Sequence, residues 1–275
     1  MSQGGSDRSV DAVVVGSGAG GLAAAVTAAR LGLQVLVLEK DSLYGGTTAR
    51  SGGVLWVPCH GLGDGSNGPD SPEAARRYLQ GECGAAFDAD KVDAFLRHGP
   101  RMVDFFTRQT EVAFANLPEF PDYHPDRPGA SQGGRSILAA PYDARRLGPR
   151  MKQLRPPLKE ITFMGMMFNA SEEVQHFFKV TRSLRSAAYV ARRLAAHAVE
   201  MLRHGRATRL TNGNALAARL AQSAFGLGVE LWLDTPVVEL LREGDRVIGV
   251  VVQRGGERLR VNARRGVVLA AGGFP

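Results

Sequence analysis

The chain has 275 residues, of which 44% are hydrophobic and 22% are charged, as is typical of a globular protein with a sizeable buried core. The formal net charge is +7, but the basic residues are spread along the chain without a nucleic-acid reader motif, so we expect no nucleic-acid partner. No apolar run is long enough for a transmembrane segment. The polar start lacks a secretory pattern, and we expect a cytoplasmic protein.

Two cysteines, Cys59 and Cys83, are too few and too far apart for a CxxC redox pair, a zinc site or an iron–sulfur cluster. We expect no metal site and expect both thiols to be buried among apolar side chains. Any redox chemistry must then come from an organic cofactor.

The N-terminal region reads as a βαβ unit. Val10–Val15 is a valine-rich run typical of a buried parallel strand. Gly20–Leu31 is alanine-rich and predicts a helix that Gly32 ends. Gln34–Leu38 predicts a second buried strand with Glu39 at its carboxyl end.

The middle of the chain predicts a long functional loop and several helices. Residues 41–68 are rich in Gly, Thr and Ser, and 70–108 read as helical, with Ser71-Pro72-Glu73 as a start signal and Asp88 opening a second helix. Residues 114–157 are proline-rich and predict irregular loops. Residues 183–204 carry apolar side chains at helical spacing, and their arginines predict a solvated face rather than membrane contact.

The C-terminal region predicts one helix followed by short strands. Residues 214–225 read as a helix that ends at Gly226. Apolar runs broken by turns then predict strands at 230–233, 237–241, 247–253, 259–261 and 266–274.

The spacing Gly16-x-Gly18-x-x-Gly21 lies between the first predicted strand and helix. The first glycine permits a tight turn, the second lets the backbone approach a pyrophosphate, and the third permits close packing of helix on strand. Glu39 can accept hydrogen bonds from both hydroxyls of a ribose and would repel a 2′-phosphate. The pattern therefore predicts binding of NAD or FAD.

The following segment, Leu43–Gly53 (LYGGTTARSGG), distinguishes these two cofactors. Its glycines bracket hydroxyl side chains along one stretch, which suits the long diphosphate and ribityl chain of FAD. An NAD-dependent dehydrogenase has no need of such a stretch, and it would leave the final GVVLAAGGF unexplained.

These residues carry a family resemblance. Residues 13–58 and 211–274 resemble the fumarate reductase and succinate dehydrogenase flavoprotein family, and GGTTARSGG followed by LWVP resembles its 3-ketosteroid dehydrogenase branch. The resemblance implies a Rossmann-like α/β FAD-binding domain of the glutathione-reductase type, formed by residues 1–70 and 210–275. An inserted, incomplete α+β cap would occupy residues 71–209.

The resemblance also implies roles for individual residues. It implies that the pyrophosphate is held by Gly16, Ser17, Gly18, Ala19 and Gly21, and that Glu39 and Lys40 lie on the adenosine side. It implies that the ribityl chain and the flavin ring lie along Gly46, Thr47, Thr48, Ser51, Gly52 and Gly53. It implies an adenine contact from the backbone of Val238 and closure over the diphosphate by Ala271, Gly272 and Gly273. The succinate dehydrogenase histidine that binds FAD covalently has no counterpart between Leu43 and Gly53, which implies noncovalent FAD.

The implied reaction is hydride transfer between the flavin and a carbon next to a carbonyl-activated bond, with an external electron acceptor. A 3-ketosteroid or another cyclic ketone is the first implied substrate, and a fumarate-like dicarboxylate is the alternative. In the segment PDYHP, Tyr123 resembles a tyrosine that lies near the steroid ring, where a phenol assists proton removal. The alternative for Tyr123 is simple packing in a proline-rich loop.

Family members continue beyond the final strand, so we expect this chain to correspond to their N-terminal half. A non-catalytic FAD-binding fragment would share every cofactor motif and remains open at this point.

Overall fold

The computed structural model describes residues 8–63, 70–168 and 172–273. The chain forms two compact units: the first from its two ends, up to residue 51 and from residue 141 onward, and the second from residues 52–140. These units do not follow the predicted boundaries at 70 and 210. Strand β3 (Leu55–Trp56) pairs with β5 (Ser136–Ala139) in the second unit, while β6 (Tyr142–Asp143) pairs with β7 (Arg209–Leu210) in the first.

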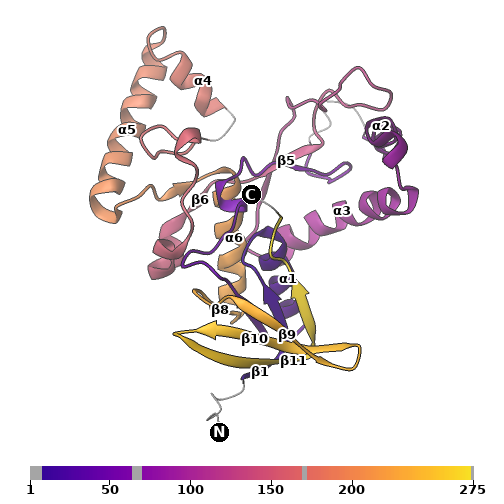
Figure 1. The fold of residues 1–275 in the computed structure, drawn as a ribbon. Helices are drawn as coiled ribbons and strands as arrows, with labels where there is room; N and C mark the ends of the chain where they lie inside the picture. The colour runs from indigo at the N-terminus through magenta and orange to yellow at the C-terminus, as the bar shows by residue number, and fades with distance from the viewer. Residues whose placement is uncertain (1–7, 64–69, 169–171, 274–275) are drawn as a thin grey trace. The chain divides into compact units, whose positions relative to one another are not determined.

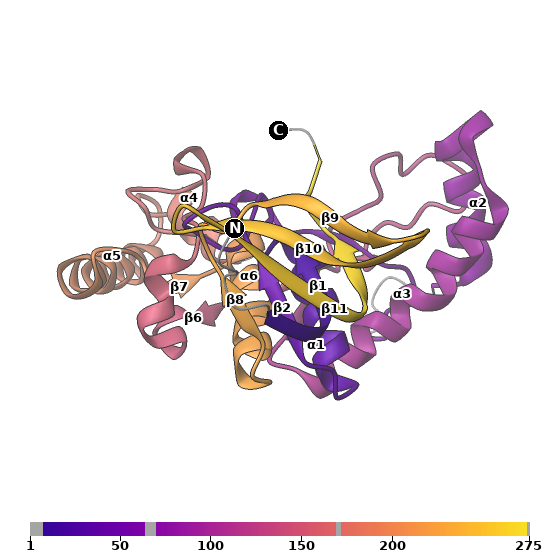
Figure 2. The same ribbon diagram turned by 60° about the horizontal axis from the view of Figure 1, so that its bottom comes forward.

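The first unit is built on a six-stranded sheet with the strand order β8-β2-β1-β11-β10-β9. Strands β8, β2, β1 and β11 run parallel, and β10 and β9 continue the sheet in antiparallel pairing. Figures 1 and 2 show these strands beside the N-terminal helix. The strands are β1 (Arg8–Val15), β2 (Val35–Leu38), β8 (Glu230–Trp232), β9 (Val237–Glu243), β10 (Arg246–Arg254) and β11 (Glu257–Leu269).

The predicted βαβ unit is confirmed. Helix α1 (Ala19–Arg30) connects β1 to β2, and Gly32 just beyond it has a φ of +81°, a conformation that glycine adopts without steric cost. Alternate side chains of the central strands form a core cluster of Val10, Val13, Leu36, Leu38, Val250, Val252, Val261 and Ala263. Each fully buried aliphatic side chain contributes about 1.5–3 kcal/mol, and this cluster holds the parallel and antiparallel parts of the sheet together.

The two strands predicted at 259–261 and 266–274 are one strand in the structure. β11 first pairs with β10 and then continues alongside β1, with a register shift opposite Val10 and Ala12. The charged pair Arg264 and Arg265 interrupts the apolar pattern, but Arg264 Nε lies 2.9 Å from Asp11 Oδ1 and pairs with it at the strand surface. Phe274, the predicted end of the last strand, lies outside the described residues.

Helix α6 (Asn212–Gly226) packs against α1 and against the short helix η1 (Thr48–Arg50). It is buried along most of its length, which confirms the predicted helix at 214–225. The rest of the first unit contains η3 (Ala144–Gln153), η4 (Lys159–Ile161), α4 (Glu172–Phe178) and α5 (Leu184–His204). Helix α5 confirms the helix predicted at 183–204, and the Ser183 side chain caps it.

The second unit contains the predicted pair of helices, α2 (Pro72–Cys83) capped by Ser71 and α3 (Ala89–Gln109) capped by Asp88. Between them lies η2 (Gly84–Ala86), and the region predicted to be irregular holds β5 in a three-stranded sheet with β3 and β4 (Phe114–Asn116). The prediction of two buried cysteines is wrong for Cys83, which is exposed, while Cys59 is partly buried. Cys83 does not belong to the buried face of α2, which is formed by Ala75 and Tyr78.

Among the described helices, none combines the length and the apolar character that crossing a bilayer requires.

Gly213 gives a test of how α6 packs. A Cβ at this position would lie 2.0 Å from Thr48 O, whereas a Cβ at Gly226 in the same helix meets nothing within 4 Å. We expect Gly213→Ala to lower the free energy of unfolding by about 1–3 kcal/mol through overpacking. Gly226→Ala should leave it unchanged or raise it by up to about 1 kcal/mol. Urea titration of both variants measures the difference, and equal stabilities would contradict the packing described.

Candidate cofactor site

The glycines of the first turn differ in what surrounds them. Gly16 has a φ of +103°, and a Cβ there would lie 2.3 Å from Ala270 O; a Cβ at Gly21 would lie 1.9 Å from Gly16 O. These two glycines are required by the close approach of backbone segments. A Cβ at Gly18 would meet only Thr48 Oγ1, at 3.7 Å. Space is therefore open at the second glycine, where a pyrophosphate approaches the turn.

The N-terminus of α1 adds positive potential at this turn. The N-cap residue, Gly18, has no side chain that could cap the helix. The backbone N–H of Ala19 donates to Thr48 Oγ1 at 3.0 Å. The unpaired N–H groups and the dipole of a helix start favour an anion. The turn therefore fits a diphosphate.

Glu39 is buried at the carboxyl end of β2 and faces the same turn. Its Oε2 accepts hydrogen bonds from Ser17 N at 3.0 Å and Ser17 Oγ at 2.5 Å, and its Oε1 accepts from Asp41 N at 3.1 Å. A carboxylate offers about four acceptor positions, so Glu39 retains capacity for a ribose hydroxyl. Its negative charge fits a ribose without a 2′-phosphate.

The chain that leads into β9 passes next to Glu39. Thr235 N donates to the backbone oxygen of Glu39 at 2.9 Å, and Val238 follows three residues later with 44% of its surface exposed. Lys40 is exposed. The structure thus brings the segment that carries Val238 to the end of β2, although a contact with adenine remains a prediction.

The segment predicted to bind the ribityl chain folds back over the glycine turn. Gly45 N donates to Ser17 Oγ at 3.2 Å, and a Cβ on Gly46 would lie 3.2 Å from the Cα of Gly18. Thr47 is exposed at the start of η1, and Ser51 Oγ donates to Thr48 O at 2.9 Å. Gly52 and Gly53 begin the second unit, and their role remains a prediction.

Two residues that the sequence analysis did not single out support this segment from behind. Asn214 is fully buried in α6, and its Nδ2 donates to Ala49 O at 3.0 Å and to Arg155 O at 2.8 Å. Arg155 Nη2 in turn donates to Asp41 Oδ2 at 2.5 Å, and this hydrogen bond lowers the pKa of Asp41 below its ordinary value. Asn214 lies in residues 211–274, which resemble the family, but the local sequence does not indicate which partners it contacts.

The last predicted segment begins beside Gly16. Ala270 N donates to Val15 O at 2.8 Å, directly after β11. Ala271, Gly272 and Gly273 are exposed, and Gly272 has a φ of +83°. Because β1, β2 and β11 are parallel, Gly16, Glu39 and Ala270 lie at the same edge of the sheet. Ligands of open α/β sheets bind at this edge.

Tyr123 belongs to the second unit and is 92% exposed. The interpretation of Tyr123 as a side chain packed in its loop is therefore wrong, since its neighbour Asp122 and not Tyr123 enters the interior. His124 is exposed and contacts Glu82 of α2. Within the described residues, no group of His, Cys, Asp and Glu side chains has the arrangement of a metal site.

Cys59 gives a test of the environment in the second unit. Burial, and then the nearby Asp70 carboxylate, raise the pKa of the Cys59 thiol to about 11. At pH 8 this thiol stays protonated, and since the thiolate is the nucleophile, we expect iodoacetamide to label the exposed Cys83 first, at least about tenfold faster. Peptide mass spectrometry measures both rates, with Cys83→Ser as the control. Equally fast labelling of Cys59 would contradict the burial described.

Comparisons with known proteins agree with this geometry. A family model for the FAD binding domain matches residues 11–275. The 4-oxocyclohex-2-ene-1-carboxylate 5-dehydrogenase of Sinomonas cyclohexanicum is 41% identical over 264 residues, which are 96% of this chain and 44% of that protein. The 3-oxosteroid 1-dehydrogenase of Mycobacterium tuberculosis is 37% identical over 270 residues, covering 96% of this chain and 47% of that protein.

Solved structures show the same relationship. The 3-ketosteroid delta1-dehydrogenase of Sterolibacterium denitrificans, in complex with 1,4-androstadiene-3,17-dione, has 35% identity and a TM-score of 0.87 over 97% of this chain and 48% of its own. A flavocytochrome c3 fumarate reductase, at 18% identity and a TM-score of 0.53 over 98% of this chain and 35% of its own, shares the fold. The chain spans about half the length of the curated relatives it matches. Since the family model matches the sequence from the first strand onward, this chain belongs to the FAD-binding domain family, and FAD is its cofactor.

Proposed function

We propose that the protein is an FAD-dependent dehydrogenase that introduces a C=C bond next to the carbonyl of a cyclic ketone, with a 3-ketosteroid as the first substrate to test. The observation that carries the proposal is the match, at a TM-score of 0.87 and over 97% of this chain, to a dehydrogenase structure that holds a steroid. The relatives named for oxocyclohexene and oxosteroid substrates share a ring ketone. A ring ketone is therefore the chemical class that we assign.

The geometry of the first unit supports the proposed cofactor-binding roles. Gly18 and the start of α1 would hold the diphosphate, Glu39 the ribose, and Thr48 with Ser51 the ribityl side. The segment 43–53 has no histidine, which supports noncovalent FAD. When bound, FAD supplies the hydride acceptor, and an external acceptor must then reoxidise it.

Dehydrogenation removes a hydride from one ring carbon and a proton from the carbon next to the carbonyl. We assign the proton step to Tyr123, whose Oη would take or relay the proton. The 92% exposure of its side chain supports this assignment, since a tyrosine that serves only packing is normally buried.

Dye reduction tests the proposal on purified protein with bound FAD. A 3-ketosteroid should reduce an artificial electron acceptor at a rate proportional to enzyme, and 4-oxocyclohex-2-ene-1-carboxylate serves as the smaller ring ketone. If neither ketone drives reduction, the proposed class is wrong. If fumarate instead oxidises a reduced dye, the alternative of a dicarboxylate substrate gains support.

Gly18→Ala tests the diphosphate site. The structure has room for the methyl group in the absence of cofactor, so we expect normal thermal stability. The methyl group would occupy the approach of the diphosphate, and FAD affinity should fall at least about tenfold, or about 1.4 kcal/mol. Gly20→Ala is the matched control, because a Cβ there meets nothing within 4 Å. Titration of each apoprotein with FAD measures the affinities of the two variants. An unchanged FAD affinity of Gly18→Ala would contradict the assigned site.

Tyr123→Phe tests the proton step. It removes only an exposed hydroxyl, so stability and FAD content should not change. We expect kcat to fall by about 10²–10⁴-fold, the range typical of a lost general acid or base, with a smaller change in KM. Steady-state kinetics with the 3-ketosteroid measure both constants, and wild-type turnover would exclude the role.

A further inference from the structure

The second unit buries a charged guanidinium. Arg135 is 2% exposed. Its Nε and Nη2 donate to Asp70 Oδ1 at 3.0 and 2.8 Å. Its Nη1 donates to Asp122 Oδ2 at 2.8 Å and to Gly129 O at 2.9 Å. Burying charges is costly, and well-packed apolar side chains often stabilise a fold equally well or better. Stability alone therefore does not account for this cluster.

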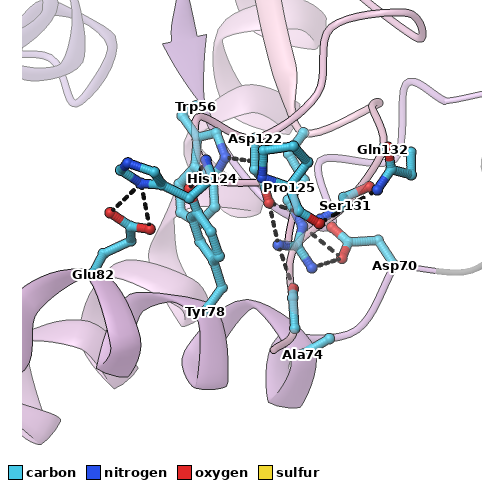
Figure 3. Close-up of polar contacts among 12 residues, drawn as sticks. Trp56, Asp70, Ala74, Tyr78, Glu82, Asp122, His124, Pro125, Ser131 and Gln132 are labelled. Carbon is cyan, nitrogen blue, oxygen red and sulfur yellow. Dashed lines mark hydrogen bonds and ion pairs between the residues drawn. The ribbon is translucent and has the colours of Figure 1, made fainter. Parts of the chain in front are cut away.

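Both carboxylate oxygens of Asp122 accept hydrogen bonds in this cluster. Its Oδ1 accepts from Trp56 Nε1 at 2.7 Å, and its Oδ2 accepts from Ser131 N at 2.9 Å in addition to Arg135. The Trp56 ring stacks on Phe95 of α3, with centroids 6.1 Å apart. Figure 3 shows Asp122 next to Trp56. The residue on the N-terminal side of Tyr123 is thus hydrogen-bonded to Trp56 of β3 and to Arg135, which directly precedes β5.

The backbone on the other side of Tyr123 is attached to α2. His124 N donates to Tyr78 Oη at 3.3 Å, and His124 Nδ1 lies 2.9 Å from Glu82 Oε1 (Figure 3). Tyr123 itself is 92% exposed. An exposed side chain between two anchored neighbours has a restricted backbone and a free functional group, an arrangement suited to presenting that group to a ligand.

We propose that Arg135, acting through Asp122, is a positioning residue that holds the backbone from which the Tyr123 phenol is presented to substrate. The proposal rests on the role proposed for Tyr123 above. Arg135 and Asp70 do not themselves contact substrate in this account. Their function is to hold the 121–135 segment in one conformation, because a misplaced catalytic group reacts more slowly.

A structural readout tests the positioning without any turnover. The protein has five tyrosines, and in protein labelled with 3-fluorotyrosine the ¹⁹F resonance of Tyr123 is assigned by its loss in Tyr123→Phe. We expect Asp122→Asn and Arg135→Lys to shift or broaden this resonance, while those of Tyr44, Tyr142 and Tyr189 in the first unit stay in place and report intact folding. Arg135→Lys keeps the charge but cannot bridge both carboxylates. Asp104→Asn is the control, because the exposed Asp104 side chain pairs with Arg108 on the surface of α3.

A kinetic readout tests whether the cluster acts through Tyr123. Asp122→Asn and Arg135→Lys should each lower kcat by about tenfold to about a hundredfold, with KM changed less, and Asp104→Asn should not. In the Tyr123→Phe background neither substitution should lower kcat further, because residues that act through one group are non-additive.

The outcomes separate this proposal from the proposed function. An unmoved Tyr123 resonance in both variants, or a further loss of kcat in the Tyr123→Phe background, overturns the positioning role and leaves the role of Tyr123 intact. Wild-type turnover of Tyr123→Phe overturns the role of Tyr123 and the positioning proposal with it. A moved resonance together with non-additive loss of kcat supports both.

Discussion

Three backbone segments meet at the turn between β1 and α1 with no space for a side chain. A Cβ at Gly16 would collide with Ala270 O, and a Cβ at Gly21 would collide with Gly16 O. Because β1, β2 and β11 are parallel, they end at one edge of the sheet. At that edge this close approach leaves the start of α1 open at Gly18, and Ser17 reaches the Glu39 carboxylate. The features assigned to FAD all depend on this approach.

The same edge is completed by chain from far along the sequence. The segment around Thr48 is held against the turn by Ala19 N on one side and by α6 on the other, where Gly213 and Asn214 contact its backbone. Asn214 donates to the carbonyl oxygens of Ala49 and Arg155, which lie on either side of the second unit in the sequence. This hydrogen bonding explains how a loop rich in glycine keeps one conformation while residues 52–140 form a unit of their own.

Local signals predicted the parts of this fold that depend on neighbouring residues. The valine runs and the glycine spacing predicted the βαβ unit, and the start signals at Ser71 and Asp88 predicted helices α2 and α3. Contacts between distant residues were not predictable in this way. Arg264 and Arg265 appeared to divide a strand that pairing with β10 and β1 makes continuous. The burial of Arg135 depends on Asp70 and Asp122, which are 65 and 13 residues away along the chain.

We infer that the edge formed by Gly18, Glu39 and Thr48 holds FAD without a covalent bond. The most direct test is the visible absorption spectrum of the purified chain, recorded before and after denaturation. We expect a flavin spectrum in the folded protein and free FAD in the filtrate once the chain unfolds. A colourless protein that takes up no added FAD, or flavin that stays attached to the denatured chain, would contradict it.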